Sequence, residues 1–146
     1  MKSTEMNKFS CSEVSWDKEK NKLKQVRYSV FIEEQGVAQE LEWDGEDNDS
    51  LHFLALSNDK KPIGTARLTS SGQIGRMAVL SELRGNGIGL SLLQLAIRTA
   101  RKNGMTKVFL HAQEHAIEFY KLEHFVAEGD LFIEAGISHQ LMRKKL

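Results

Sequence analysis

Three glycines at alternate positions, Gly85, Gly87 and Gly89, constrain the fold most, because a β-type apolar run gives way to a helical run there. A strand that ends at a glycine-rich turn and restarts as a helix leaves backbone N–H groups unpaired beside the positive end of the helix dipole. Such a turn binds phosphate or pyrophosphate, and a Cβ would hold the anion away from those groups. The alternative is that the glycines only permit tight packing.

Two other phosphate-binding loops do not fit the spacing. A Walker loop requires G-x-x-x-x-G-K-[ST], and no lysine follows any of these glycines. A dinucleotide fingerprint requires G-x-G-x-x-G, but the third position counted from Gly85 is Leu90. Neither type of nucleotide loop is therefore expected.

Apolar periodicity predicts an α/β chain. Residues 17–35 repeat apolar side chains at helical spacing, with Asp17 as N-cap and Gly36 as the stop. The runs "LHFLALS", "KPIGTARLTS" and "QIGRMAVL" predict three antiparallel strands. A long helix then follows the glycines and ends at Gly104, "KVFLHA" predicts a buried strand, and "EHAIEFYKLE" a short helix. The remaining chain predicts two final strands. This order indicates a mixed α/β layer.

Composition narrows the partners. A chain of 146 residues is expected to form one domain, residues 1–146, with a sizeable core. Lys and Arg number 20 and Asp and Glu number 20, so the net charge is zero and nucleic acid is not an expected partner. Cys11 is the only cysteine, which fits a reducing compartment. No segment resembles a signal peptide or has the ~20 apolar residues of a membrane span, so we expect a cytoplasmic protein without a membrane partner.

An acidic segment, "QELEWDGEDNDSLH", holds six carboxylates between positions 40 and 49. It is not a calcium loop: counted from Asp44, Asp49 takes the required glycine position and Ala55 the final glutamate position. A solvated loop is favoured, and a rim that attracts a cationic substrate is the alternative. Trp43, inside the segment, keeps the alternative open.

The string "HAQEH" matches the H-x-x-E-H pattern of inverted zinc proteases through His111, Glu114 and His115. That pattern needs one continuous helix to bring both histidines to a single metal ion. Here His111 ends an apolar β-type run and the helical pattern begins only afterwards. A zinc-dependent hydrolase is thus the less favoured enzyme class, and no metal is expected.

Arg84, Gly87 and Gly89 form the pattern [RQ]-x-x-G-x-[GA] between a strand and a long helix, which resembles the acyl-CoA pyrophosphate loop of the GNAT superfamily of N-acetyltransferases. A second signature of that family is similar to Gln113, Ala116 and Tyr120. The runs "VRYSVFIEEQGV" and "GTARL" resemble its small bacterial branch. Two departures stand out: Gln113 replaces the usual Asn, and His124 replaces the usual Gly before Phe125.

The resemblance implies one GNAT-like domain, with a mixed, mostly antiparallel central sheet and helices on both faces. It also implies acetyl-CoA as co-substrate. The backbone of Met77, Ala78 and Val79 would pair with the pantetheine arm as another strand would. Gln113 would hydrogen-bond the cofactor, and Tyr120 would lie near the thioester sulfur. The pyrophosphate would be held by N–H groups of Arg84, Gly85, Asn86, Gly87, Ile88 and Gly89.

Acyl transfer to an amine needs two proton transfers. A tyrosine hydroxyl can protonate the departing thiolate, which makes Tyr120 the candidate acid, although a core aromatic is the alternative. A carboxylate must deprotonate the incoming ammonium; Glu33, Glu34 and Glu114 are candidates, and Glu34 is favoured for its place at the end of the first helix. A non-catalytic acyl-CoA sensor remains a further alternative. The sequence names neither the amine acceptor nor whether two chains form a homodimer.

Overall fold

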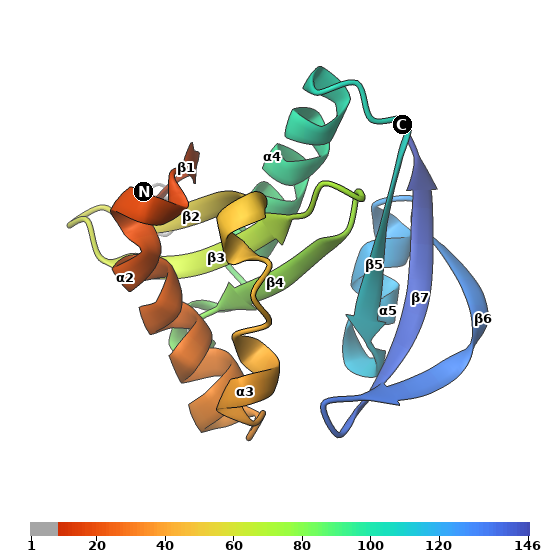
Figure 1. Ribbon diagram of the computed structural model, residues 1–146, viewed down its shortest axis with the longest axis horizontal. Helices are drawn as coiled ribbons and strands as arrows, with labels where there is room; N and C mark the ends of the chain where they lie inside the picture. Colours follow the sequence, from red (N-terminus) through yellow and green to blue (C-terminus); the bar gives the residue numbers. More distant parts are fainter. Residues whose placement is uncertain (1–8) are drawn as a thin grey trace.

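The computed structural model describes residues 9–146 (Figure 1). The first eight residues, part of the stretch without a signal-like apolar run, lie outside the described residues. Four strands form an antiparallel sheet in the order β1-β2-β3-β4. Their bounds are Phe9–Val14 for β1, Leu51–Ser57 for β2, Pro62–Leu68 for β3 and Ile74–Val79 for β4.

A second antiparallel sheet has the order β5-β7-β6, with β5 at Lys107–Gln113, β6 at Val126–Glu134 and β7 at Ile137–Lys145. One parallel bridge between Gln73 and Phe109 joins the two sheets, and the Phe109 N–H donates to the Gly72 carbonyl at 3.0 Å. Beyond this bridge β4 and β5 run in the same direction but diverge, so a wedge opens between them (Figure 1).

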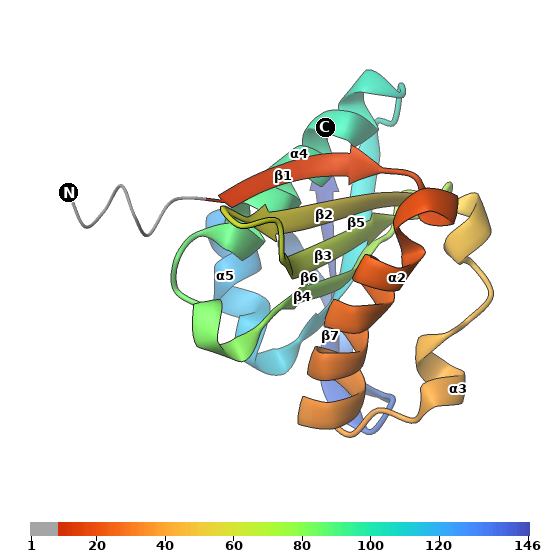
Figure 2. The ribbon, with the colours of Figure 1, turned by 90° about the vertical axis from the view of Figure 1, so that its left-hand side faces the viewer.

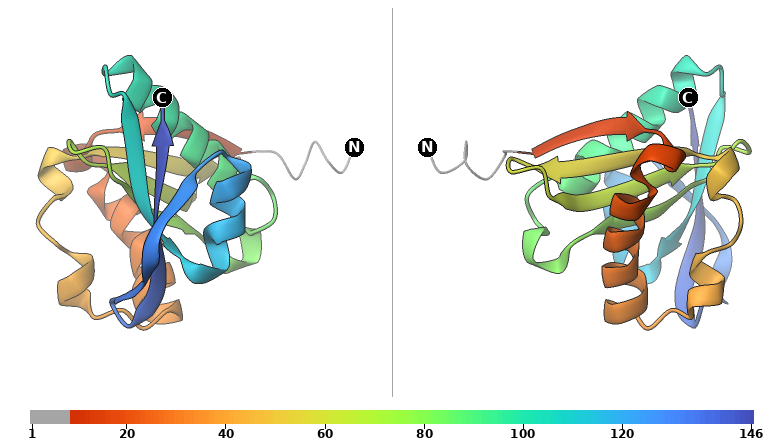
Figure 3. Two further views of the ribbon diagram at one scale, coloured as in Figure 1. Left: turned by 90° about the vertical axis from the view of Figure 1, so that its right-hand side faces the viewer. Right: turned by 60° about the vertical axis from the view of Figure 1, so that its left-hand side comes forward.

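Helices cover both faces of the sheet, as Figure 2 shows for α2 (Trp16–Arg27) and α4 (Ile88–Lys102). The helix α5 (Ile117–Leu122) packs against the three-stranded sheet (Figure 3). Short helical turns fill the connections: α3 (Gln39–Glu42), η2 (Asp47–Asp49), η3 (Ser81–Leu83) and η4 (Glu114–Ala116). The α/β class, with a mostly antiparallel sheet and helices on both faces, is confirmed.

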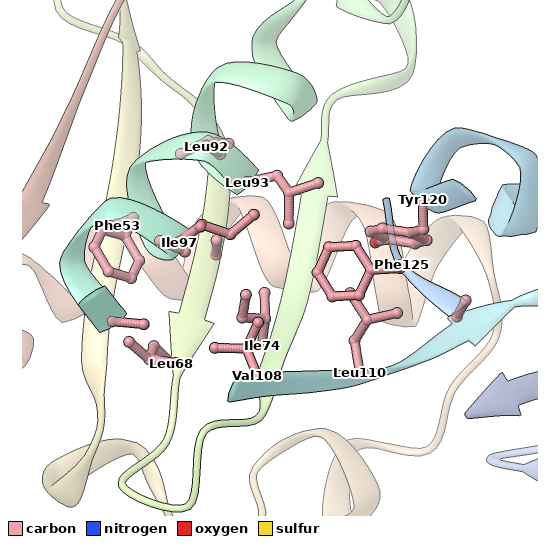
Figure 4. Close-up of a cluster of buried hydrophobic side chains, with 14 of the residues drawn as sticks. Phe53, Leu68, Ile74, Leu92, Leu93, Ile97, Val108, Leu110, Tyr120 and Phe125 are labelled. Carbon is pink, nitrogen blue, oxygen red and sulfur yellow. The ribbon is translucent and has the colours of Figure 1, made fainter. Parts of the chain in front are cut away.

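The core lies between α4 and the sheets (Figure 4). One apolar face of α4 is buried there, with Leu92, Leu93, Ala96 and Ala100 at 0% exposure. Close approach of α4 to β3 depends on Gly64, because a Cβ at this position would lie 3.0 Å from both Ile88 Cγ2 and Leu92 Cδ1. This packing sets the direction in which the N-terminus of α4 points.

The first predicted helix changes pitch part of the way along. The α-helix α2 ends at Arg27 and continues as a π-helix, η1 (Tyr28–Glu34), in which the Gln35 N–H donates to the Val30 carbonyl at 3.1 Å. A π-helical turn widens the helix, and such turns are frequent at functional sites. The wide turn places the end of η1 at the mouth of the wedge.

Strand β1 was missed by the sequence analysis. Its residues "FSCSEV" alternate, but only Phe9 and Cys11 offer apolar contacts to the core, so the period-2 signal is weak. Pairing with β2 along its whole length, from Phe9↔Ser57 to Val14↔His52, makes the strand. Within residues 9–146, no helix combines the length and the apolar character that crossing a bilayer requires.

Candidate active site

A cavity of about 920 Å³ occupies the wedge between β4 and β5. Most of the residues singled out by the sequence share its lining: Glu34, Met77, Ala78, Val79, Arg84, Gly85, Gly87, Ile88, Gly89, Gln113 and Tyr120. Asn86 does not line it. Its side chain turns back instead, with Nδ2 donating to the Leu83 carbonyl at 3.0 Å, and so fixes the shape of the loop.

Strand β4 carries a β-bulge where it borders the cavity. Thr65 pairs with Ala78 and Arg67 with Gly75, so Arg76 and Met77 together oppose a single residue of β3. Arg76 has φ 49°, and its carbonyl accepts a hydrogen bond of 2.8 Å from Thr65 Oγ1. Bulges re-aim a strand next to active sites. Because β4 ends the four-stranded sheet, its outer edge beyond the bulge can pair with an extended ligand.

The glycine loop takes the conformation that only glycine adopts easily. Gly85 has φ 86° and Gly87, the N-cap of α4, has φ 85°. A Cβ at either position would meet no atom within 4 Å, so both glycines face open space. The Ser91 N–H donates to the Gly87 carbonyl at 3.0 Å, and the N–H groups before Ser91 therefore have no carbonyl within the helix. They can bind an anion.

Arg84 and Glu34 form a two-pronged ion pair across the mouth of the cavity. Arg84 Nη1 lies 2.7 Å from Glu34 Oε2, and Nη2 lies 2.6 Å from Oε1. Arg84 Nε also donates to the Val79 carbonyl at 3.0 Å. The hydrogen bonds and charge of Arg84 lower the pKa of Glu34, so in this arrangement its carboxylate is a weak base. Glu33 and Glu114, the other predicted bases, are not among the lining residues.

A pair of amides ties η1 to β5. Gln113 Nε2 donates to Gln35 Oε1 at 2.9 Å, and Gln35 Nε2 donates to Gln113 Oε1 at 3.3 Å. Gln113 is thus held at the end of β5, at the cavity surface, by the residue that follows η1. Gln35 was not singled out in the sequence, because its partner lies 78 positions away.

Tyr120 projects from α5 beside Phe125 (Figure 4). Its ring centroid lies 5.0 Å from that of Phe119 and 5.8 Å from that of Phe125. Burial raises the pKa of Tyr120 to about 12, so the hydroxyl keeps its proton at neutral pH. His124 has φ 71°, which explains why the family's pattern has glycine there, and the Phe125 N–H closes the turn on the Tyr120 carbonyl at 3.1 Å.

The acidic segment is a solvated loop only in part, which corrects the favoured interpretation. Glu42 is 3% exposed and Asp47 7% exposed. They and Asp44 form ion pairs with three arginines from separate elements; this arginine cluster consists of Arg27, Arg67, Arg76, Glu42, Asp44 and Asp47. Glu40, Asp44, Glu46 and Asp49 stay exposed. Three carboxylates of the segment therefore fold it onto the sheet, which also rules them out as an unpaired acidic rim.

The ion pairs of the arginine cluster have short distances between nitrogen and oxygen atoms. Arg27 Nε lies 2.7 Å from Glu42 Oε2, and its Nη1 lies 2.9 Å from Asp47 Oδ1. Arg67 Nη2 lies 2.9 Å from Asp44 Oδ2. Burial alone would raise the pKa of Asp44, but hydrogen bonds and charge from Arg67 and Arg76 outweigh it and lower the pKa to about 2. Trp43 packs over the Arg27 guanidinium, and Arg27 Cζ lies 5.0 Å from the centroid of the Trp43 ring.

The string "HAQEH" does not lie on one helix, as the sequence analysis expected. His111 belongs to β5, whereas Glu114 and His115 lie in the turn η4. His111 Nδ1 lies 3.2 Å from both Glu134 oxygens, and His139 Nδ1 donates to the Ile137 carbonyl at 2.7 Å. Nowhere in residues 9–146 do three or more His, Cys, Asp or Glu side chains gather in a way that could hold a metal ion.

Comparison with known proteins gives one consistent family. The family model described as "Acetyltransferase (GNAT) domain" matches residues 15–146. An N-acetyltransferase of Bacillus subtilis, YjcF, described as uncharacterized, is 33% identical over 123 residues, which cover 82% of this chain and 87% of that protein.

Solved structures agree. The crystal structure of Escherichia coli ElaA superposes with a TM-score of 0.83 at 27% identity and covers 93% of this chain and 99% of that one. An acyl-CoA N-acyltransferase from Pseudomonas aeruginosa superposes with a TM-score of 0.79 at 31% identity and covers 93% and 97%.

Proposed function

The chain belongs to the GNAT acetyltransferase family, and on that premise we propose that it transfers an acetyl group from acetyl-CoA to a primary amine. The observation that carries the proposal is the wedge between β4 and β5, which ends at a glycine turn and the N-terminus of a long helix. An extended arm with a pyrophosphate at one end fits that shape. The similarity to an acyl-CoA N-acyltransferase supports an acyl-CoA as the donor.

In this proposal the cofactor lies along β4. The backbone of Met77, Ala78 and Val79 pairs with the pantetheine amides, because the outer edge of β4 is free there. The N–H groups of the glycine loop and the first turn of α4 bind the pyrophosphate. The Gln113 amide hydrogen-bonds the arm from β5, where the two strands are apart.

Tyr120 assists the departure of the thiolate. Its hydroxyl has no hydrogen-bond partner within residues 9–146 and belongs to a side chain that lines the cavity. Since burial raises its pKa to about 12, the hydroxyl is a donor at neutral pH and can give a hydrogen bond, and then a proton, to the sulfur as the C–S bond breaks.

A cationic acceptor is favoured by the charge of the cavity. Among the carboxylates that line the cavity, Glu34, Glu42 and Asp44 are paired with arginines, which balance their charge. Glu46 and Glu134 have no arginine partner within the described residues. An amine that arrives as an ammonium ion is therefore attracted to this side of the cavity. The single cysteine favours a reducing compartment such as the cytoplasm for this reaction.

The test is release of CoA from acetyl-CoA in the presence of polyamines, amino acids, peptide N-termini and amine drugs. We expect amine-dependent release, matched by formation of the N-acetyl product in mass spectrometry. Acetyl-CoA should also raise the melting temperature, because it binds only the folded state. A rise in melting temperature without CoA release by any acceptor would support the acyl-CoA sensor. If acetyl-CoA caused neither a rise in melting temperature nor CoA release, that result would contradict the proposal.

A further inference from the structure

We propose that His111, oriented by Glu134, accepts the proton that the acceptor's ammonium group must lose before it attacks. The proposal rests on the acetyl transfer proposed above and names a proton acceptor for it. A lysine-like amine has an ordinary pKa of about 10.4 and arrives protonated, so some group at the cavity wall must accept that proton. Glu34 is held by Arg84 and is a weak base in that pair.

Strand register places His111 near the narrow end of the wedge. The two sheets meet at the parallel bridge between Gln73 and Phe109. Two residues further along each strand are Gly75 and His111, at the level where β4 and β5 begin to separate, and both line the cavity. A Cβ at Gly75 would meet no atom within 4 Å, so the space there is open. An arm that starts at the glycine loop and lies along β4 would extend its thioester end toward this level.

The imidazole lies on the face of β5 that looks away from the core. Val108, Leu110 and Ala112 are buried, and the residues between them alternate to the opposite face. His111 therefore shares its face with Gln113, which lies one pleat further along the strand. An acceptor that enters from this side meets the imidazole before it meets the thioester.

Glu134 gives His111 the arrangement of a base. Both Glu134 oxygens lie 3.2 Å from Nδ1, so this nitrogen carries the proton and donates it to the carboxylate. The lone pair is then on Nε2, free to take a proton. The carboxylate stabilises the imidazolium that forms, in the way an aspartate supports histidine in hydrolases. The rings of Phe132, at 5.1 Å, and Phe109, at 6.2 Å, flank the imidazole.

Two other histidines line the same cavity but lack a carboxylate partner. His139 Nδ1 donates to a backbone carbonyl, at Ile137, and His115 has no hydrogen bond within the described residues. The other charged groups of the wall beyond the Arg84–Glu34 pair are Glu42, Asp44, Glu46, Arg67 and Arg76. Asp44 and Arg76 pair with each other at 3.1 Å. His111 is thus the histidine whose charged form has a counter-ion in place.

The ammonium gives one proton to Nε2 of His111, and the freed lone pair forms the C–N bond at the thioester carbonyl. The C–S bond then breaks, the sulfur leaves with its electron pair, and it takes a second proton from the nitrogen through Tyr120 or water. The imidazolium returns its proton to solvent. The products are an acetamide, free CoA and one proton.

The experiment compares His111→Gln with the unmodified protein, using two acceptors: an alkylamine, protonated at pH 7, and an aromatic amine, neutral at pH 7. For the alkylamine we expect kcat/KM to fall by ~10²-fold, within the range that positioned proton transfer contributes. For the aromatic amine, which arrives without the extra proton, the fall should be only a few-fold. The glutamine in Glu134→Gln still accepts a hydrogen bond from Nδ1–H but lacks the negative charge. We therefore expect kcat/KM to fall more for the alkylamine than for the aromatic amine, with a smaller fall than in His111→Gln.

Controls separate this role from a structural one. Glu128→Gln removes a carboxylate from the same strand, where it pairs with Arg143, and should leave both rates unchanged. The rise in melting temperature with acetyl-CoA should persist in every variant. Equal losses of kcat/KM for both amines would overturn the role of His111, and so would a selective loss in His139→Gln instead of His111→Gln. Either result would leave the proposed acetyl transfer itself unaffected. If the unmodified protein acetylates no amine, the proposed function falls first and takes the role of His111 with it.

Discussion

The two sides of the cavity are built in different ways. The glycine-loop side, residues 77–89, is one continuous stretch that presents backbone groups and left-handed glycines. The arginine cluster joins side chains from α2, β3, β4 and the acidic segment, with partners 15 to 34 positions apart. A site made of backbone is encoded locally, whereas a site made of paired side chains depends on the completed fold.

Their energetics differ as well. The loop holds no buried charge, so its cost is the strain of positive φ, which glycine removes. The arginine cluster buries Arg27 at 1% exposure between Trp16 and Trp43, with its charge matched by Glu42 and Asp47. A buried charge that loses its partner is expensive. Substitutions in the loop should therefore affect binding, and substitutions in the cluster should affect stability.

The largest effect is expected at Gly87. Gly87→Val places a branched side chain in the open space where the pyrophosphate would lie, so acetyl-CoA should no longer raise the melting temperature. The substitution also carries a cost from φ 85°, of about 1–2 kcal/mol. Thermal unfolding with and without acetyl-CoA measures both effects.

Gly104 provides a matched control at the other end of α4. It has φ 84°, and a Cβ there would likewise meet no atom within 4 Å. Gly104→Val should lose similar stability yet keep the full rise in melting temperature with acetyl-CoA. If both variants kept the rise, the pyrophosphate would not bind at the glycine loop.

The next largest effect is expected at Asp47, in the arginine cluster. Asp47→Asn leaves Arg27 and Arg67 without their shared carboxylate, and breaking a buried pair costs about 3–5 kcal/mol of unfolding free energy. Urea unfolding measures it. Glu128→Gln, which breaks a surface pair with Arg143, should cost less than about 1 kcal/mol. Equal costs would mean that the cluster adds no more than a surface pair.

The same substitution should show a defined pH dependence. Burial would raise the pKa of Asp47, but the hydrogen bonds and charges of Arg27 and Arg67 lower it overall. A carboxylate with a lowered pKa stabilises the fold above its unfolded pKa, about 3.9, and loses that contribution as the pH falls through its folded pKa. The stability difference between Asp47→Asn and the unmodified protein should therefore shrink below about pH 4.

The sequence predicted the fold well where local pattern decided it. The long helix α4, the meander β2–β4 and the turn at Gly87 follow from periodicity and glycine spacing within single segments. Strand β1 escaped because its apolar positions are few and its pairing with β2 spans some 40 residues. The π-helical end of the first helix also escaped, since its apolar residues fit an α-helix equally well.

Residues of the candidate site could likewise be predicted only where a local motif indicates them. The glycine loop, Gln113 and Tyr120 came from motifs and line one cavity. The pairing of Glu34 with Arg84 spans 50 positions, and that of His111 with Glu134 spans 23, so no local pattern indicates either. Acidic residues in a row predict solvent exposure unless arginines on distant elements reach them, as Arg27 and Arg67 do here.

A smaller effect, on rate alone, is expected at Tyr120. Tyr120→Phe keeps the ring between Phe119 and Phe125 and removes only the hydroxyl, so stability and acetyl-CoA affinity should change little. If the hydroxyl protonates the thiolate, kcat should fall by ~10²-fold. The fall should be smaller with an acyl donor whose thiol is more acidic, because a better leaving group needs less help. An unchanged kcat would return Tyr120 to a purely structural role.

The smallest effect is expected from two non-glycine residues at positive φ, one outside the arginine cluster and one inside it. His124, at φ 71°, is exposed, and Arg76, at φ 49°, binds Glu42 and Asp44. His124→Gly relieves strain and loses no ion pair, so it should raise the unfolding free energy by up to about 1 kcal/mol. That gain corresponds to an increase in melting temperature of about 2–4 °C. Arg76→Gly relieves the same kind of strain but leaves Glu42 buried with one arginine fewer, so it should destabilise. Opposite signs in calorimetry would show that backbone strain decides stability at His124 and side-chain charge at Arg76, whereas equal signs would contradict that difference.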